Sequence, residues 1–465
     1  MSRDVTNLLY LITIVTFILA LRFLSNPATA RRGNQIGALG MLVAIAVTFA
    51  QKGVDSYWEI IVGMIVGGAF GAFAARKVHM TAMPQMVALF NGVGGGAAAL
   101  ISLAEFHNRA PDPGALKTDI SASIMLSAII GSISFAGSMV AFAKLQELIR
   151  GRPITFPLQQ AANGLLFAAI AAAGIAITAG SEQQWLIWAL AAGASLFGIL
   201  FVLPIGGADM PVVISLLNAC TGLAAAATGF ELENNVLIVS GMLVGASGTL
   251  LTIMMGRAMN RSVANVLFGA FGQLAPSAAG GGAAGATDAQ VRSATAEDVA
   301  VMLGYANKVV FVPGYGMAVA QAQHDVRALA DLLEARGVEV SYAIHPVAGR
   351  MPGHMNVLLA EANVPYPQLK EMDEANSEFS RTDVALVIGA NDVVNPDARN
   401  NPGSPIYGMP ILNVDAAQQV VVLKRSMNPG FAGIENPLFL TPNTSMLFGD
   451  AKESIHKLAT AVKAL

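Results

Sequence analysis

Nine apolar runs in the first 256 residues constrain this chain more than any other feature. Each run is long enough to cross a bilayer as a helix, for which about 17–25 residues suffice. The runs lie near residues 6–24, 35–51, 56–75, 84–104, 120–144, 157–179, 184–204, 210–230 and 235–256. Lipid offers no hydrogen-bond partner to an open backbone, so such runs fold as helices. We therefore predict a multi-span α-helical membrane bundle over residues 1–261, embedded in the lipid bilayer.

Lys and Arg residues in the short loops between the runs predict the orientation, because cytoplasmic loops are enriched in them. One set of alternate loops holds ten: Arg22, Arg31, Arg32, Arg76, Lys77, Lys144, Arg150, Arg152, Arg257 and Arg261. The other set holds four: Arg3, Lys52, Arg109 and Lys117. We expect an inner (cytoplasmic) membrane protein with its N-terminus outside and its C-terminal half in the cytoplasm.

A few polar residues lie among the apolar ones. They are Asn91, Asn163, Ser215 and Asn218 inside runs, and Asp209 at the cytoplasmic mouth of the eighth run. Each either lines a functional path or makes an interhelical hydrogen bond. No Asp, Glu, His, Lys or Arg lies near the middle of a run. A proton path through this chain alone would therefore run on water, Asn and Ser. Frequent glycines, such as Gly63 and Gly67, predict closely packed helices.

The composition changes after the ninth run. Residues 1–261 hold 14 Lys and Arg against 11 Asp and Glu, whereas residues 262–465 hold 13 against 19. Between them, residues 275–286 consist of Ala, Gly, Ser and Pro, which is typical of a flexible connector. We place a linker at 262–290 and a cytoplasmic domain at 291–465.

The same composition argues against several kinds of site. No basic stripe points to nucleic acid. The single cysteine, Cys220, cannot form an internal disulfide, and the six histidines are scattered along the chain. We therefore expect no metal, haem or iron–sulfur site.

Strands and helices alternate in the C-terminal domain. Strands are expected at Val309–Val312, Val338–Ile344, Val384–Ile388, Met409–Asn413 and Val420–Lys424. Helices are expected from the capping box of Thr295 and Asp298 to about Tyr305, and at Met317–Arg336, Asn356–Ala362, Tyr366–Asn376 and Asp450–Leu465. This alternation predicts a doubly wound α/β (Rossmann-like) nucleotide-binding domain, in which ligands bind beyond the carboxyl ends of parallel strands.

The loop after the first strand reads Gly314, Tyr315, Gly316 and Met317. A Gly-x-Gly turn between a strand and a helix suits a pyrophosphate, because backbone N–H groups at a helix N-terminus bind anions. The third glycine of the dinucleotide fingerprint is Val319 here, so a plain turn is the alternative.

The loops after two further strands contain polar and charged residues that could bind a nucleotide. Gly389, Ala390, Asn391 and Asp392 follow a buried strand and offer hydrogen bonds to a nicotinamide or ribose, or form an ordinary turn and cap. The loop of Val347, Ala348, Gly349 and Arg350 brings a cation that could meet the pyrophosphate charge.

The choice of nucleotide depends on a cation cluster. Lys424, Arg425 and Ser426 offer two positive charges and a hydroxyl, the groups that a phosphate monoester attracts. An NAD site usually has an acidic residue at the end of the second strand, where this chain has His345. We therefore predict NADP(H) rather than NAD(H). Gly430 and Phe431 lie in a glycine-rich loop that suits a lid.

Seven segments resemble the beta subunit of proton-translocating nicotinamide nucleotide transhydrogenases. They are Gly206–Val213, Gly314–Gln323, His345–Arg350, Pro352–Ala362, Gly389–Asp392, Lys424–Asn428 and Leu447–Lys452, which contains Gly449 and Asp450. The resemblance runs from end to end of the chain. It implies a Re/Si-specific enzyme that exchanges hydride directly between NADH on an alpha subunit and NADP⁺ on this chain while protons cross the membrane. It also implies that the alpha subunit adds membrane helices and that the assembled unit is a homodimer.

The resemblance also assigns roles to residues. It gives Gly314, Tyr315, Gly316 and neighbouring Met317 to the pyrophosphate turn, and Val347, Ala348, Gly349 and Arg350 to nucleotide contacts. It gives Gly389, Ala390, Asn391 and Asp392 to the nicotinamide side, and Lys424, Arg425 and Ser426 to the 2′-phosphate. Gly430 and Phe431 belong to the lid, and Gly449 and Asp450 to the cofactor site. No acid–base catalyst is implied; the coupling candidates are Asp392, Asp209, Asn91, Asn218 and Ser215.

This chain departs from the family pattern at two positions. Many members have a histidine in the fourth span where this chain has Asn91, so the titrating group lies on a partner helix or the path differs. The lid aromatic, often tyrosine, is Phe431. Two other functions stay open: an NADP(H)-sensing channel or transporter without redox chemistry, and a membrane scaffold with a vestigial nucleotide fold.

Overall fold

The computed structural model describes most of the chain. It covers residues 3–50, 57–78, 82–111, 116–146, 148–149, 154–181, 183–206, 209–259, 291–349, 353–404, 406–430 and 432–465. The chain divides into two compact units, which are described separately. The predicted linker at 262–290 lies outside the described residues, so the domain boundaries stay a prediction.

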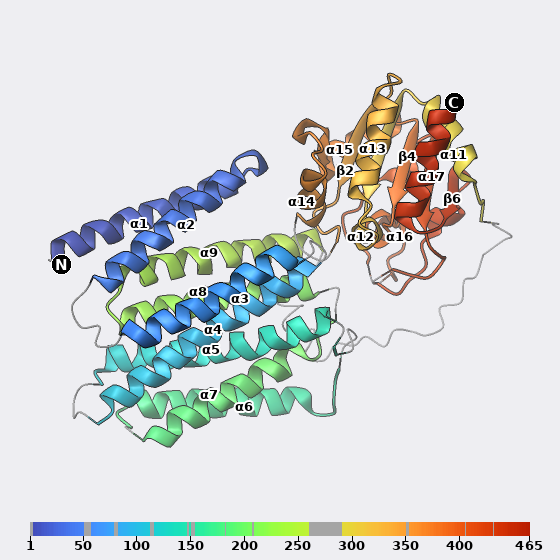
Figure 1. The fold of residues 1–465 in the computed structure, drawn as a ribbon. Helices are drawn as coiled ribbons and strands as arrows, with labels where there is room; N and C mark the ends of the chain where they lie inside the picture. Colours follow the sequence, from blue (N-terminus) through green and yellow to red (C-terminus); the bar gives the residue numbers. More distant parts are fainter. Residues whose placement is uncertain are drawn as a thin grey trace. The chain divides into compact units, whose positions relative to one another are not determined.

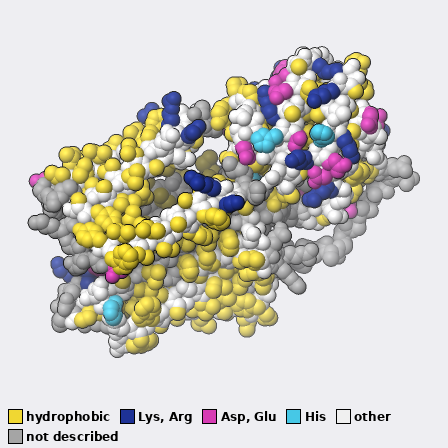
Figure 2. Space-filling view, viewed as in Figure 1, with side chains coloured by type: hydrophobic (Ala, Val, Ile, Leu, Met, Phe, Trp, Pro, Cys, Tyr) yellow, Lys and Arg dark blue, Asp and Glu magenta, His cyan; other side chains and the backbone are white. Residues whose placement is uncertain are grey.

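The first unit is a helical bundle (Figure 1). Within the described residues, nine helices are long and apolar enough to cross a membrane, which confirms the nine predicted spans. They are α1 (Arg3–Leu24), α2 (Pro27–Phe49), α3 (Tyr57–Lys77), α4 (Met83–Arg109), α5 (Thr118–Leu145), α6 (Gln159–Thr178), α7 (Gln184–Val202), α8 (Met210–Glu231) and α9 (Asn235–Ala258). Figure 2 shows hydrophobic side chains covering much of the visible face of this unit, as expected of a surface that meets lipid.

Glycines decide how closely some of these helices approach. α4 packs along α5, and α5 packs along α7. A Cβ atom on Gly131 of α5 would lie 2.6 Å from the backbone oxygen of Gly95 in α4, so only glycine allows this approach. The glycines of α3 differ from the expectation of close packing. Gly63, Gly67, Gly68 and Gly71 have no described residue within 4 Å of such a Cβ position.

The second unit is built around a parallel six-stranded sheet (Figure 1). Its order is β3-β2-β1-β4-β5-β6, with every pair parallel. The strands are β1 (Lys308–Pro313), β2 (Glu339–Ile344), β3 (Leu369–Glu371), β4 (Val384–Ile388), β5 (Gln419–Lys424) and β6 (Thr444–Phe448). The helices are α11 (Ala296–Gly304), α12 (Tyr315–Val319), α13 (Gln323–Glu334), α14 (His354–Glu361), α15 (Met372–Glu378), α16 (Asp397–Asn400) and α17 (Ala451–Ala464).

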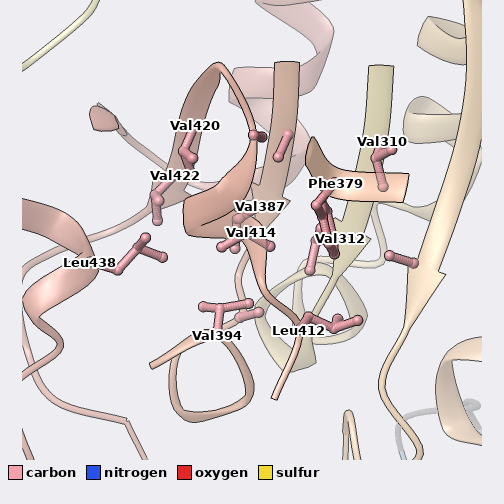
Figure 3. Packing of buried hydrophobic residues seen from close by; sticks show 14 of the residues in the cluster. Val310, Val312, Phe379, Val387, Val394, Leu412, Val414, Val420, Val422 and Leu438 are labelled. Atoms are coloured by element: carbon pink, nitrogen blue, oxygen red, sulfur yellow. The ribbon is translucent and has the colours of Figure 1, made fainter. Parts of the chain in front are cut away.

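The sheet buries both of its faces, as a doubly wound fold requires. Alternate residues of the central strands, such as Val310 and Val312, pack with Phe379 and with loop residues including Leu412 and Leu438 (Figure 3). α13 and α17 pack against each other, and they contact β2 and β5 respectively. The Rossmann-like prediction is confirmed, as is the helix that begins at the Thr295 capping box.

Three local predictions for the second unit are wrong. The helix expected at Met317–Arg336 is broken into α12 and α13, because Gln321 takes a left-handed backbone conformation with φ of 50°. Met409–Asn413 is not a strand: Pro410 lacks an N–H, and the Leu412 N–H donates to the Val393 oxygen at 2.9 Å. The helix expected at Tyr366–Asn376 is split into a 3-10 turn (Tyr366–Gln368), β3 and α15.

Candidate functional site

The predicted Gly-x-Gly turn lies against the turn that follows β4. The Gly314 N–H donates to the Ile388 oxygen and the Gly316 N–H to the Gly389 oxygen, both at 2.9 Å. A Cβ atom on Gly389 would lie 2.4 Å from the Gly316 Cα, and Gly389 has a φ of 65°. Only glycine satisfies both demands. The structure therefore joins two predicted site loops, those beginning at Gly314 and Gly389, at backbone contact distance.

These loops lie at the point where the strand order reverses. From β1, the chain adds β2 and then β3 on one side, and it then returns to place β4 on the other side of β1. In open parallel sheets, ligands bind in the crevice outside the carboxyl ends of the strands at such a switch point. The topology thus places Gly314, Tyr315, Gly316 and Met317 beside Gly389 and Ala390 at the expected position.

Three backbone donors of this turn are already in use, which the sequence did not indicate. Besides the Gly314 and Gly316 N–H groups, the Met317 N–H donates to the Gly314 oxygen at 3.1 Å. α12 is also only five residues long and carries little macrodipole. In this state, the charge of a pyrophosphate would have to be met largely by side chains. The assignment of this turn to the pyrophosphate stays a prediction.

Asn391 and Asp392 connect the β4 turn to the predicted lid. The Ala432 N–H donates to Asp392 Oδ2 at 2.9 Å. With its amide in the orientation that serves Gly430 and Lys424, the Asn391 side-chain oxygen accepts from the Gly430 N–H at 2.5 Å and from Lys424 Nζ at 3.3 Å. The described part of the lid is therefore closed onto the β4 turn. Phe431 lies outside the described residues.

The three residues of the cation cluster differ in their surroundings. Lys424 is partly buried, its ammonium lies 4.9 Å from the centre of the Phe439 ring, and it donates to the Asn428 oxygen. Burial lowers the pKa of Lys424, and the charge of Asp392 opposes that shift. The Ser426 hydroxyl accepts from the Asn428 N–H at 3.4 Å. Arg425 is exposed and makes no hydrogen bond or ion pair with the residues that the structure describes, so its guanidinium is open to an anion.

The loop after β2 is organised by a buried histidine. The Val347 N–H donates to His345 Nδ1 at 3.2 Å, and Nε2 lies 2.8 Å from the Pro410 oxygen. A carbonyl only accepts, so Nε2 carries the hydrogen and the ring is neutral. Burial lowers the pKa of His345, while its bond to Pro410 has the opposite effect. The Ala348 N–H bonds to the His345 oxygen at 3.0 Å.

The loop continues with Gly349, a position that requires glycine. Gly349 has a φ of 104°, and a Cβ there would lie 2.4 Å from His354 Nδ1. Arg350 lies outside the described residues.

At the carboxyl end of β6, the Gly449 N–H donates to the Lys424 oxygen at 3.1 Å, and Asp450 caps α17 through the Lys452 N–H at 3.0 Å.

Asn91 lies in a polar cluster of the bundle, together with Ser134, Ser138 and Thr221. Asn91 Nδ2 donates to the Ser138 hydroxyl at 2.9 Å, and the Ser134 and Thr221 hydroxyl oxygens are 2.5 Å apart. The cluster joins α4, α5 and α8.

The other bundle candidates lie apart from that cluster. Ser215 donates to the Gly248 oxygen at 3.2 Å and accepts from the Thr252 hydroxyl at 3.1 Å, linking α8 to α9. Asn218 is partly buried in α8, and Asp209 precedes that helix. Asn163 is buried in α6, and its Oδ1 has no hydrogen-bond partner among the described residues.

Two residues with functional chemistry escaped the sequence interpretation. Asn436 is buried, and its Nδ2 donates to the Asn391 backbone oxygen at 3.0 Å, so it supports the β4 turn. The Asn436–Pro437 dipeptide is a turn signal that could have drawn attention to it. Glu231 is fully buried at the end of α8. It lies one residue beyond the eighth apolar run, where no local pattern sets it apart. Within the described residues, no group of three or more His, Cys, Asp or Glu side chains could hold a metal ion.

Comparison with known proteins gives one consistent result. The model of the family described as NAD(P) transhydrogenase beta subunit matches residues 6–461. Two sequences from Rhodospirillum rubrum, one of them from a named strain, are both called NAD(P) transhydrogenase subunit beta. Each is 50% identical to this chain over 466 residues, covering 99% of this chain and 100% of the relative.

Proposed function

The chain belongs to the family of NAD(P) transhydrogenase beta subunits, and from that premise we propose that it binds NADP(H) and exchanges hydride with NAD(H) on a partner alpha subunit. Family membership itself implies the use of nicotinamide nucleotides and a partner alpha subunit. The nine membrane-length helices and the family together indicate a multi-pass membrane protein. Which nucleotide binds here, how the subunits assemble and how protons move are the parts that we propose.

Arg425 is the main reason for proposing NADP(H). It follows β5 at the carboxyl edge of the sheet, where the strands end. It is exposed and has no partner among the described residues. A guanidinium that is not already paired can bind a 2′-phosphate bidentately. At the end of β2, where an NAD site would present a carboxylate to the ribose, the chain presents the neutral, buried His345. Both observations favour a phosphorylated ribose.

Calorimetric titration of the purified full-length chain with NADPH and with NADH tests this choice. We expect NADPH to bind more tightly, and Arg425→Ala to weaken NADPH binding by roughly 10- to 100-fold, the range for a lost charged hydrogen bond. NADH binding should not change. Arg381→Ala is the matched control, because Arg381 is also exposed but precedes β4 at the opposite edge. Equal affinity for both nucleotides would contradict the proposal, and absence of binding would favour the scaffold alternative.

The hydride step needs no acid or base from this chain. Hydride passes directly between two nicotinamide rings, so the protein contributes placement and the exclusion of water. The Asn391–Asp392 turn, closed by the Gly430 loop, is where we place the nicotinamide. Mixing the chain with its alpha subunit should give NADPH oxidation dependent on an NAD⁺ acceptor. Nucleotide binding without this reaction would favour the NADP(H) sensor.

Protons, in this proposal, cross the bundle into the cytoplasm and act on the nucleotide domain through conformation. A protonation event shifts an equilibrium only by its different interaction with the two states. Asp209, just before α8, is our candidate for relaying that shift. In sealed vesicles that contain the complex, Asp209→Asn should leave NADPH binding intact while reducing proton movement per hydride transferred. An unchanged ratio would exclude Asp209 from coupling.

A further inference from the structure

Glu231, the last residue of α8, is a carboxyl group buried within the helical bundle. Its side chain is 0% exposed, and its Oε2 atom has no hydrogen-bond partner among the described residues. Its Oε1 atom lies 3.0 Å from the Ser102 hydroxyl of α4. An ionised oxygen without a partner is costly to bury, whereas a protonated carboxyl is far cheaper. The site therefore favours a carboxyl that carries its proton.

The count of hydrogens around Ser102 leads to the same conclusion. The Ser102 hydroxyl oxygen lies 3.0 Å from Glu231 Oε1 and 3.1 Å from the Ala98 backbone oxygen. A hydroxyl has one hydrogen, so it cannot donate fully to both acceptors. If Glu231 is protonated, its own O–H donates to Ser102, and Ser102 donates to Ala98. Both contacts are then complete, which makes Ser102 a hydroxyl through which a proton can enter or leave Glu231.

The charged neighbours of Glu231 do not neutralise it. Among the described residues, those that act on its charge are Glu105 and Arg109, both on α4. Arg109 Nε pairs with Glu105 Oε1 at 2.5 Å, and Arg109 Nη2 donates to the backbone oxygen of Glu231 at 3.2 Å, not to its carboxyl. The nearby cation therefore holds the end of α8 in place and leaves the carboxyl free to gain and lose a proton.

Polar side chains continue from Glu231 into the bundle. One turn back along α8, the Thr228 hydroxyl oxygen lies 2.8 Å from that of Ser127 in α5, and Ser127 also reaches the Ala98 oxygen at 3.5 Å. The Asn91 cluster begins at Thr221, seven residues or about 10 Å farther along α8. A proton that travels between the two groups would need water for that distance.

We propose that Glu231 is the proton-exchanging carboxyl that this chain contributes to the transport path, at the end of the bundle where α8 ends. The inference rests on the proposed function, because it assigns a residue to the proton movement proposed above. An O–H bond forms on the carboxyl when a proton arrives from water and breaks when the proton moves on; nothing is oxidised or reduced. The loop charges predict that this end faces outward.

The test uses the complete complex with its alpha subunit in sealed vesicles, where transhydrogenation and proton movement are measured together. Glu231→Gln keeps the shape of the side chain but cannot exchange a proton. We expect it to reduce proton movement and coupled transhydrogenation by roughly 100-fold or more, with unchanged NADPH affinity. The control is Glu105→Gln, which breaks a partly exposed i,i+4 pair and should change both rates by less than about twofold.

A purely structural role for Glu231 is separated by the pH profile. Glu231→Asp retains a carboxyl and should recover part of the activity, with its rate–pH profile displaced from that of the wild type. An unchanged profile in Glu231→Asp, or wild-type proton movement in Glu231→Gln, would overturn the inference. If Glu231→Gln does not assemble, the profile of Glu231→Asp decides. If the wild-type complex itself shows no transhydrogenation, the proposed function fails instead.

Discussion

The sheet has an amino edge, where its strands begin, and a carboxyl edge, where they end. Different interactions stabilise the loops at these two edges. At the amino edge, Lys308 of β1 pairs with Glu339 at 2.9 Å and with Glu378 at 2.8 Å. Asp383 accepts the backbone N–H groups of Asn307 and Lys308 at 2.7 and 3.1 Å. At the carboxyl edge, by contrast, glycine contacts join the β1 and β4 turns, and backbone N–H groups join the lid to Asn391 and Asp392.

The amino edge therefore serves the stability of the fold, and the carboxyl edge serves the proposed binding of a nucleotide. At the amino edge, the charges of Lys308, Glu339, Glu378 and Asp383 are paired or hydrogen-bonded, so they stabilise the fold and have little left for a ligand. The exposed guanidinium at the carboxyl edge, Arg425, has no partner among the described residues, and the turns there tolerate no side chain at Gly389. We therefore expect the carboxyl edge, which keeps an unmatched charge and tight turns, to be less stable than the amino edge, as is usual for a functional site.

The largest expected effect comes from placing a methyl group in the turn contact. Gly389→Ala puts a Cβ 2.4 Å from the Gly316 Cα in a left-handed conformation, and we expect it to cost about 3 kcal/mol or more through strain and displacement. Hydrogen–deuterium exchange of β4 peptides measures the local free energy of opening, and calorimetry measures the loss of NADPH binding.

Gly337 provides the matched control at the amino edge. It also has a positive φ, of 85°, but nothing described lies within 4 Å of its Cβ position. Gly337→Ala should therefore cost only about 1 kcal/mol and leave NADPH affinity unchanged. Similar losses for the two variants would show that the steric contact between the turns contributes little.

The second prediction is that the two edges lose stability in different pH windows. Burial lowers the pKa of His345 at the carboxyl edge below its ordinary value of 6.5. Below pH 6.5 the unfolded chain binds a proton that the folded chain does not. Stability therefore falls by up to about 1.4 kcal/mol per pH unit until the pH passes below the folded pKa. Exchange of the β2 loop should accelerate in that window, and His345→Gln should remove the dependence.

The amino edge should respond only at lower pH. Backbone N–H groups of Asn307 and Lys308 lower the pKa of Asp383, and a hydrogen bond from Lys308 lowers the pKa of Glu378. The stability that these carboxylates provide is complete above their ordinary values of 3.8 and 4.5 and is lost as the pH falls through the folded values. If both edges opened together near pH 6, the contrast between them would be wrong.

The third prediction concerns the lid. Asp392→Asn replaces the charged acceptor of the Ala432 N–H, which lies 2.9 Å from Oδ2, with a neutral amide. We expect a loss of about 1 kcal/mol in lid closure, seen as NADPH dissociating faster in stopped-flow displacement. Asp397→Asn, in the neighbouring helix α16, should leave the dissociation rate unchanged. Equal rates in Asp392→Asn and the wild type would show that this bond does not hold the lid.

The sequence predicted the long, regular helices and strands of this molecule. It did not predict the short strands or the break in a helix. Buried valine strands and apolar runs are long enough to identify from their residues, so the nine spans and four of the six strands were anticipated. β3, with three residues, and β6, which begins with Thr444 and Ser445, lack that signal. No glycine or proline marks the break at Gln321 between α12 and α13.

The candidate site was anticipated as a set of loops but not as a set of contacts. Residue types at strand ends indicated where a nucleotide would bind. Only the fold shows that the Gly316 N–H is already bonded to Gly389, that Lys424 donates to the Asn428 oxygen, and that Arg425 is the exposed member of its cluster. Burial of Glu231 depends on α4 packing beside the end of α8, which no local pattern contains.

The smallest expected effect tests the amino edge directly. Lys308→Met removes a cation that lies between Glu339 and Glu378, and Glu378 keeps Lys370 at 3.8 Å. Because the ion pairs are only partly buried, we expect a loss of about 0.5 kcal/mol, measured as faster hydrogen exchange at the start of β1. NADPH affinity should not change, since these charges are at the opposite edge from Arg425. If Lys308→Met weakened NADPH binding as much as Arg425→Ala, the two edges would be coupled through the strands, and the amino edge would be part of the binding machinery.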